Sequence, residues 1–141
     1  MTDQYWSALV PELTVTSLDR SLAFYCAAGF TVRFRRAAPP FAYLALGEAQ
    51  LMLEEQHDAG WNVEPLDRPL GRGMNLQVDV RDACATLAGL TEMGIVPFSA
   101  VQDSWYAVSD AAEEGQREFL VQDPDGYLLR FAQSLGRRGR V

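Results

Sequence analysis

Polar and charged side chains recur at alternate positions of segments that otherwise read as apolar β-strands. Arg130 is the clearest case, because Tyr127, Leu129 and Phe131 point to one face of a strand and Arg130 to the other. The same alternation places more side chains on that face, namely Glu12, Thr14, Met52, Glu54, Asn75, Gln77 and Asp79. Carboxylates, amides and a guanidinium can hydrogen-bond a small molecule or pair with its charges. Since such groups need partners or water, the pattern predicts a solvated cleft.

Two other roles for Arg130 follow from the same residue types. Arg130 can pair with Glu12 or Glu54 in a structural ion-pair network. Alternatively, one of these glutamates can act as a base while Arg130 stabilises an enolate. The sequence contains no serine nucleophile elbow, Cys–His pair or phosphate-binding loop that favours a particular catalytic chemistry.

The segment 115–131 predicts a β-hairpin that positions Arg130. Its centre is Asp123-Pro124-Asp125-Gly126, in which proline favours the second turn position and glycine accepts the left-handed conformation. We interpret these four residues as a turn and assign them no further role.

The rest of the chain repeats one pattern. Alternating residues from Leu9 predict a strand, Ser17 caps a short amphipathic helix, and three strands follow at 30–36, 41–46 and 50–55. The same spacing of apolar residues returns after residue 73, and Asp82 then caps a second helix. This repeat predicts an α+β fold of two βαβββ modules that form a curved mixed sheet with helices on its outer face. The predicted parts of one domain, 1–141, are modules at 9–55 and 74–133, a linker loop at 56–73 and a C-terminal tail at 134–141.

The composition limits the partners. The net charge is −7 and every basic side chain is arginine, which argues against nucleic acid and membrane partners and favours cationic small molecules. The start, Met1–Gln4, lacks the pattern of a signal peptide, which predicts a cytoplasmic protein. Cys26 and Cys84 lack metal-ligand or redox spacing, so we expect reduced, buried thiols.

The segments Val10–Tyr25, Gly29-Phe30 and Phe119–Phe131 resemble the glyoxalase/bleomycin-resistance/dioxygenase superfamily, also called vicinal oxygen chelate proteins. The resemblance covers roughly residues 9–133. It implies metal-ligand positions at Val10, Met52, Asn75 and Arg130. Valine, a thioether, a neutral amide and a cation are poor ligands for a hard or borderline divalent ion, so we expect no metal and no cofactor. The one oxygen-rich alternative is a site of Glu12, Glu54 and Asp79.

The bleomycin-resistance branch of this family lacks the metal. The resemblance implies a homodimer that sequesters the drug in clefts at the dimer interface, and Pro11 matches a proline that begins an edge or exchanged strand. A flat drug with a cationic tail needs acidic and stacking side chains. The candidates for stacking are Phe34, Phe41, Trp61, Trp105 and Tyr106. Related drug binders carry a tryptophan where this chain has Glu113-Glu114-Gly115.

The predicted function is therefore bleomycin-resistance-like binding of a small molecule, a cationic aromatic antibiotic, by a homodimer. The alternative is a glyoxalase- or dioxygenase-type lyase or isomerase with an atypical or absent metal, and a third hypothesis is a partner-binding module with a vestigial cleft. No catalytic residue is assigned. The predicted ligand-binding residues are Glu12, Phe41, Met52, Glu54, Trp61, Asn75, Gln77, Trp105 and Arg130.

Overall fold

The computed structural model describes residues 5–140 and contains two modules with the same order of elements. The elements of the first module are β1 (Glu12–Val15), α1 (Leu18–Ala27), β2 (Thr31–Ala37), β3 (Pro40–Leu46) and β4 (Ala49–Glu55). Those of the second are β5 (Asn75–Asp79), α2 (Ala83–Thr91), β6 (Ser99–Ala107), β7 (Ala112–Gln122) and β8 (Leu128–Gly139).

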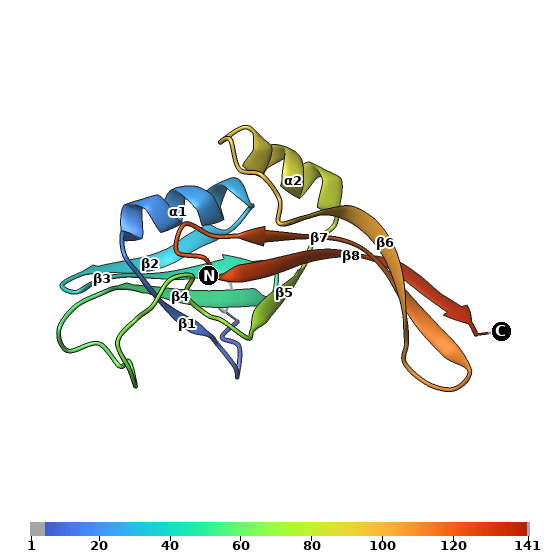
Figure 1. Cartoon of the computed structure of the whole chain (residues 1–141), viewed down its shortest axis with the longest axis horizontal. Coiled ribbons are helices and arrows are strands. Elements are labelled where there is room, and N and C mark those ends of the chain that lie inside the picture. The colour runs from blue at the N-terminus through green and yellow to red at the C-terminus, as the bar shows by residue number, and fades with distance from the viewer. Residues whose placement is uncertain (1–4, 141) are drawn as a thin grey trace.

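Each module contributes one four-stranded sheet. The strand orders are β1-β4-β3-β2 and β5-β8-β7-β6, so the two sheets share one topology. In each, the first strand pairs parallel to the last and the remaining pairs are antiparallel. Both helices lie on the same side of the sheets (Figure 1). The predicted α+β fold of two βαβββ modules is confirmed, with its strands hydrogen-bonded as two mixed sheets.

The helices begin where the sequence predicts. The side chain of Ser17 accepts a hydrogen bond from the backbone N–H of Arg20, and Asp82 accepts one from Ala85 in the same way. Each cap satisfies a backbone donor that the first helical turn leaves without a partner.

One hydrophobic core joins both modules. Alternate strand residues such as Leu53 and Phe131 point toward the helices and belong to a buried cluster that includes Leu18 and Leu90. The residues between them, Arg130 among them, therefore lie on the opposite, open faces of the sheets. This alternation sorts the polar side chains as the sequence predicts.

The turn between β7 and β8 also connects the two modules. Asp125 has an exposed fraction of 0% and accepts three hydrogen bonds: from the Thr16 backbone N–H at 3.0 Å, from Thr16 Oγ1 at 2.6 Å and from Arg68 Nη1 at 2.8 Å. Gly126 has a φ of 100°, and a Cβ atom there would lie 2.5 Å from that of Pro69. The turn is thus fixed against both the first module and the linker.

Asp123 completes this connection. It accepts a hydrogen bond from the Tyr25 hydroxyl at 2.6 Å, and Tyr127 donates its own hydroxyl to the Thr14 carbonyl at 2.9 Å. Burial raises the pKa of Asp123, while the hydrogen bonds from Tyr25 and from the backbone lower it in part. Burial likewise raises the pKa of Tyr127 to about 12.

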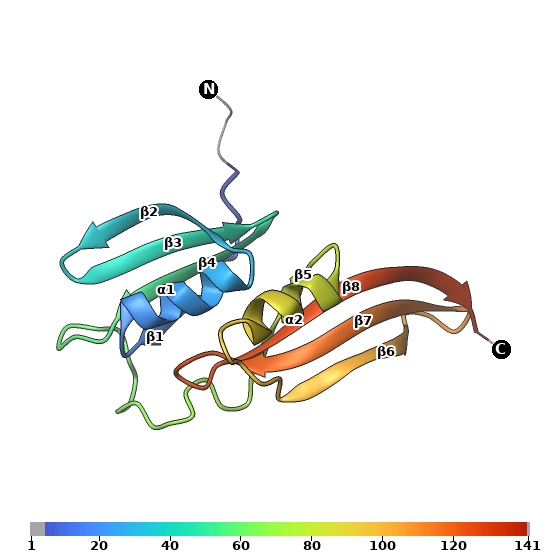
Figure 2. The same ribbon diagram turned by 90° about the horizontal axis from the view of Figure 1, so that it is seen from above.

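Several expectations need correction. Residues 134–139 continue β8 rather than forming a tail, and Figure 2 shows β7 and β8 extending away from the first module. Cys26 and Cys84 are free, as predicted, but exposed. Residues 1–4, on which the expectation about a signal peptide rests, lie outside the described residues. No helix within residues 5–140 is long and apolar enough to cross a membrane.

We predict that Asp125→Ala lowers the free energy of unfolding by about 2 kcal/mol, because it removes three hydrogen bonds to a buried carboxylate. Urea denaturation followed by circular dichroism measures this change. The control Asp110→Ala, in an exposed loop, should change it by no more than about 0.5 kcal/mol. Equal effects of the two substitutions would contradict the role assigned to Asp125.

Candidate functional site

The open face of the first sheet carries a cavity of about 480 Å³, which we call the acidic hollow. Parallel pairing of β1 with β4 places Glu12 beside Met52, and antiparallel pairing of β3 with β4 places Phe41 beside Glu54. The linker loop contributes one wall. The lining residues are Glu12, Arg36, Pro39, Phe41, Met52, Glu54, His57, Ala59 and Trp61. Five residues of the predicted site are therefore brought together here.

Glu12 and Glu54 give this hollow its negative charge. The pKa of Glu12 is raised, mainly because burial removes water from its carboxylate and to a smaller extent because the Glu54 carboxylate repels it. The positive charge of Arg36 lowers this pKa in part. His57 Nε2 lies 3.2 Å from Glu54 Oε2. His57, in the linker loop, therefore belongs to the wall of the hollow.

The aromatic side chains of the hollow differ in availability. Phe41 is only 2% exposed, because its ring is stacked on that of Phe34 and lies under the Arg36 guanidinium, 4.1 Å from the ring centroid. Trp61 is 94% exposed. Trp61 is thus the aromatic surface that the acidic hollow offers to a ligand.

The open face of the second sheet carries a cavity of about 220 Å³, which we call the neutral hollow. Arg130 Nη1 lies 3.8 Å from Glu118 Oε2, and the Tyr106 hydroxyl donates to Glu118 Oε1. The lining residues are Asn75, Ser99, Gln102, Tyr106, Glu118, Phe119, Leu120, Leu128 and Arg130. Since Arg130 pairs with Glu118, the predicted pairing with Glu12 or Glu54 is wrong.

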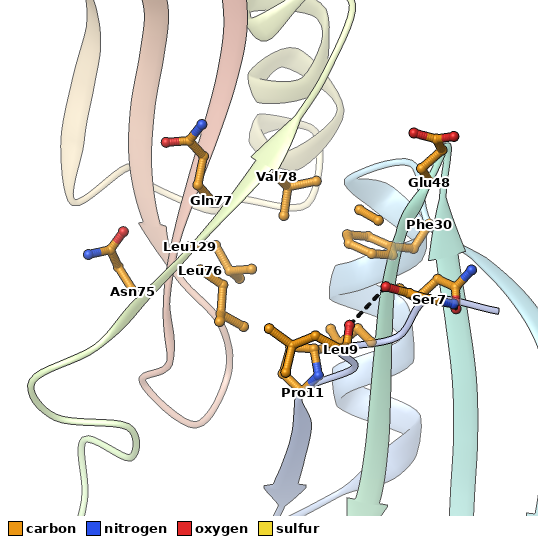
Figure 3. A pocket seen from close by; sticks show the side chains of 13 residues that line it. Ser7, Leu9, Pro11, Phe30, Glu48, Asn75, Leu76, Gln77, Val78 and Leu129 are labelled. Carbon is orange, nitrogen blue, oxygen red and sulfur yellow. Dashed lines mark hydrogen bonds between the residues drawn. The ribbon is translucent and has the colours of Figure 1, made fainter. Parts of the chain in front are cut away.

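A third cavity, of about 260 Å³, lies between the modules (Figure 3). Leu9 and Pro11 of the segment before β1 face Leu76 and Leu129 of the second module. Gln77, a predicted site residue, belongs to this cavity, although it is paired in register with Arg130. Most of its walls are apolar, and they gather no cluster of charges.

Trp105 lines none of these three cavities. It lies within β6, and its ring packs over Gly115, where a Cβ atom would lie 2.7 Å from the ring. The predicted role of Trp105 in ligand binding is therefore not supported at these cavities. The guanidinium of Arg138 covers it, 3.8 Å from the ring centroid. The ring therefore stabilises the far end of the second sheet.

Sequence reasoning missed several lining residues, of which Glu118 is the most important. The hairpin register contained the information that was needed to find Glu118. In this register Leu120 lies opposite Arg130 and Glu118 lies opposite Ala132, so Glu118 is a diagonal neighbour of Arg130 on the same face. Arg36 could not be found in this way, because irregular pairing shifts the register in β2. Tyr106 was expected as a stacking candidate, whereas its hydroxyl donates a hydrogen bond to Glu118 in the structure.

The residues at the metal positions of the superfamily do not fit a metal ion. Met52 lies in the acidic hollow, Asn75 and Arg130 lie in the neutral hollow, and Val10 lines none of the three cavities. The four side chains thus share no single site. Among residues 5–140, no group of three His, Cys, Asp or Glu side chains could hold an ion, and Asp79 lies on the sheet that does not carry Glu12 and Glu54.

Comparison with known proteins agrees with this architecture. No family model matches the chain. Bleomycin resistance proteins of Geobacillus stearothermophilus and Staphylococcus aureus are 29% identical over 136 residues, which cover 89% of this chain and 96% of each relative.

Similar solved structures include a bleomycin-binding protein complexed with bleomycin, with 26% identity, a TM-score of 0.55 and coverage of 94% of this chain and 98% of that one. A bleomycin resistance determinant encoded on the transposon Tn5 has 26% identity, a TM-score of 0.59 and coverage of 95% and 99%. A glyoxalase/bleomycin resistance protein/dioxygenase from Alicyclobacillus acidocaldarius, 17% identical with a TM-score of 0.60 and coverage of 92% of both chains, shares the fold. These matches confirm the predicted resemblance to the superfamily and its bleomycin-resistance branch.

We predict that the pKa of Glu12 responds in opposite directions to its two charged neighbours. Glu54→Gln should lower it, because a repelling carboxylate is removed, and Arg36→Gln should raise it, because an attracting charge is lost. Carboxyl ¹³C chemical shifts followed by NMR against pH measure both changes. Shifts in the same direction would show that the charges do not meet in one hollow.

Proposed function

We propose that this chain binds a cationic aromatic molecule of the bleomycin class and holds it without chemical change. The chain is similar to bleomycin resistance proteins in fold and over most of its sequence. The observation that carries the proposal is the acidic hollow, where two glutamates lie beside an exposed tryptophan. The sequence and fold similarity supplies the ligand class.

The two kinds of side chain serve the two parts of such a ligand. Glu12 and Glu54 attract a positive charge, and partial removal of water strengthens that attraction. Trp61 offers a flat surface on which an aromatic ring can stack. Binding without reaction is what the proposal requires, because sequestration alone keeps a drug from its target.

We further propose a two-fold homodimer in the cytoplasm, in which the acidic hollow of one protomer faces the neutral hollow of its partner. The neutral hollow, at about 220 Å³, is smaller than the roughly 300–1,000 Å³ typical of pockets for drug-sized ligands. The two hollows share no lining residue. A two-fold axis that joins them would form two equivalent, larger clefts.

Titration with metal-free bleomycin, followed by tryptophan fluorescence, tests the binding. We expect a saturable change at micromolar drug, and the double substitution Glu12→Gln with Glu54→Gln should weaken the affinity at least tenfold, which corresponds to about 1.4 kcal/mol. The control Glu92→Gln, just beyond α2, should leave it unchanged.

The absence of a saturable change at micromolar drug would overturn the proposal. Metal content is measured on the same protein, purified without a chelator. Stoichiometric iron, zinc or manganese together with no drug binding would favour the enzyme alternative instead.

A heterodimer tests whether the two hollows meet across a dimer interface. One protomer carries Glu12→Gln and Glu54→Gln, its partner carries Arg130→Gln, and different affinity tags allow the mixed dimer to be purified. If each cleft uses both protomers, one cleft holds every substitution and the other none, so one site of wild-type affinity returns. If the mixed dimer has no site of wild-type affinity, or if sedimentation velocity shows a monomer, this arrangement is excluded.

A further inference from the structure

The neutral hollow contains an arginine whose hydrogen-bonding capacity is unused. The Arg130 side chain is 30% exposed, and its Nη1 lies 3.8 Å from Glu118 Oε2, which is longer than a hydrogen bond. Its Nε is buried without a partner. Because a guanidinium carries five N–H donors, Arg130 retains donor capacity that water or a ligand in the hollow can use.

The positive charge of Arg130 is balanced locally. Glu118 is 5% exposed at its side chain, lies 3.8 Å from Arg130, and is held in place by the Tyr106 hydroxyl. Its Oε2 makes no hydrogen bond within the described part of the chain. Arg130 and Glu118 thus form one ion pair of zero net charge at the hollow.

The other polar side chains in the hollow are neutral. Asn75, Ser99 and Gln102 contribute amides and a hydroxyl. A ligand carboxylate here would be attracted by Arg130 but repelled by Glu118, whereas a ligand ammonium group would be attracted by Glu118 but repelled by Arg130. Neither charged group would therefore regain the free energy that it loses with its hydration. A neutral group that both accepts and donates hydrogen bonds has no such cost.

From these observations we propose that the neutral hollow recognises an uncharged carboxamide or closely similar carbamoyl group. The carbonyl oxygen accepts from the Arg130 guanidinium, and the amide N–H donates to the Gln102 side-chain oxygen, while Glu118 balances the charge of Arg130. This inference rests on the proposed small-molecule binding and adds the chemical group that the second sheet selects. It also separates the two hollows, because the acidic hollow selects a cation.

Three fragments with one ring and different charges test the inference: benzamide, benzoate and benzamidine. Each is titrated into the full chain while backbone amide signals of Gln102 and Leu120 and the indole N–H of Trp61 are followed by NMR. We expect benzamide to move the Gln102 and Leu120 signals with a Kd at least fivefold below that of benzoate or benzamidine. Benzamidine should move the Trp61 signal instead.

The substitution Glu118→Gln keeps a hydrogen-bond acceptor for Tyr106 but removes the balancing charge. In this variant benzoate should bind the neutral hollow at least fivefold more tightly than benzamide, reversing the wild-type order. If the variant does not fold, Arg130→Gln replaces it and should weaken benzamide at least fivefold, with Arg137→Gln, an exposed arginine of the same strand, as the unchanged control.

Three results would overturn the inference: a charged fragment preferred by the wild type, an unchanged order in the folded Glu118→Gln variant, or no saturable shift with benzamide. None of these depends on bleomycin. Drug binding with a wrong fragment order refutes only the carboxamide assignment, whereas the expected fragment order without drug binding refutes only the proposed drug.

Discussion

The buried carboxylate of Asp125 is the interaction on which the arrangement of the two modules depends. It belongs to the turn between β7 and β8, yet two of its three hydrogen-bond donors lie on Thr16, at the junction of β1 and α1. Asp123 and Tyr127 reach the same module through Tyr25 and Thr14. The turn that sets Arg130 on its strand therefore also holds the first sheet against the second.

Much of the fold could be predicted because local patterns determine it. The strand alternation, the caps at Ser17 and Asp82, and the return of the same spacing after the linker predict two similar modules, and the structure confirms them. The contacts of the Asp123–Gly126 turn could not be predicted. Any Asp-Pro-Asp-Gly sequence favours a turn, and only the packed structure shows which donors the two carboxylates meet.

The sequence was sufficient to predict the face of the sheet on which each candidate residue lies, but not how these residues are grouped in space. Alternation placed Glu12, Glu54 and Arg130 correctly on the open sides of their sheets, whereas tertiary packing decides that they line two separate hollows and not one cleft. The packing of Trp105 could not be predicted for a related reason, since its ring lies over Gly115, which belongs to the neighbouring strand. Single-strand periodicity contains no information about such contacts across strands.

The shared topology of the two sheets, combined with their different side chains, has a consequence for how recognition can diversify. The polar side chains of both hollows, such as Glu12 and Arg130, do not belong to the core that the modules share, so either repeat can exchange them with little repacking. Duplication thus supplies two independently variable surfaces on one stable framework. Substitutions on the open face of one sheet can therefore change the chemical groups that this face presents, while the open face of the other sheet stays the same.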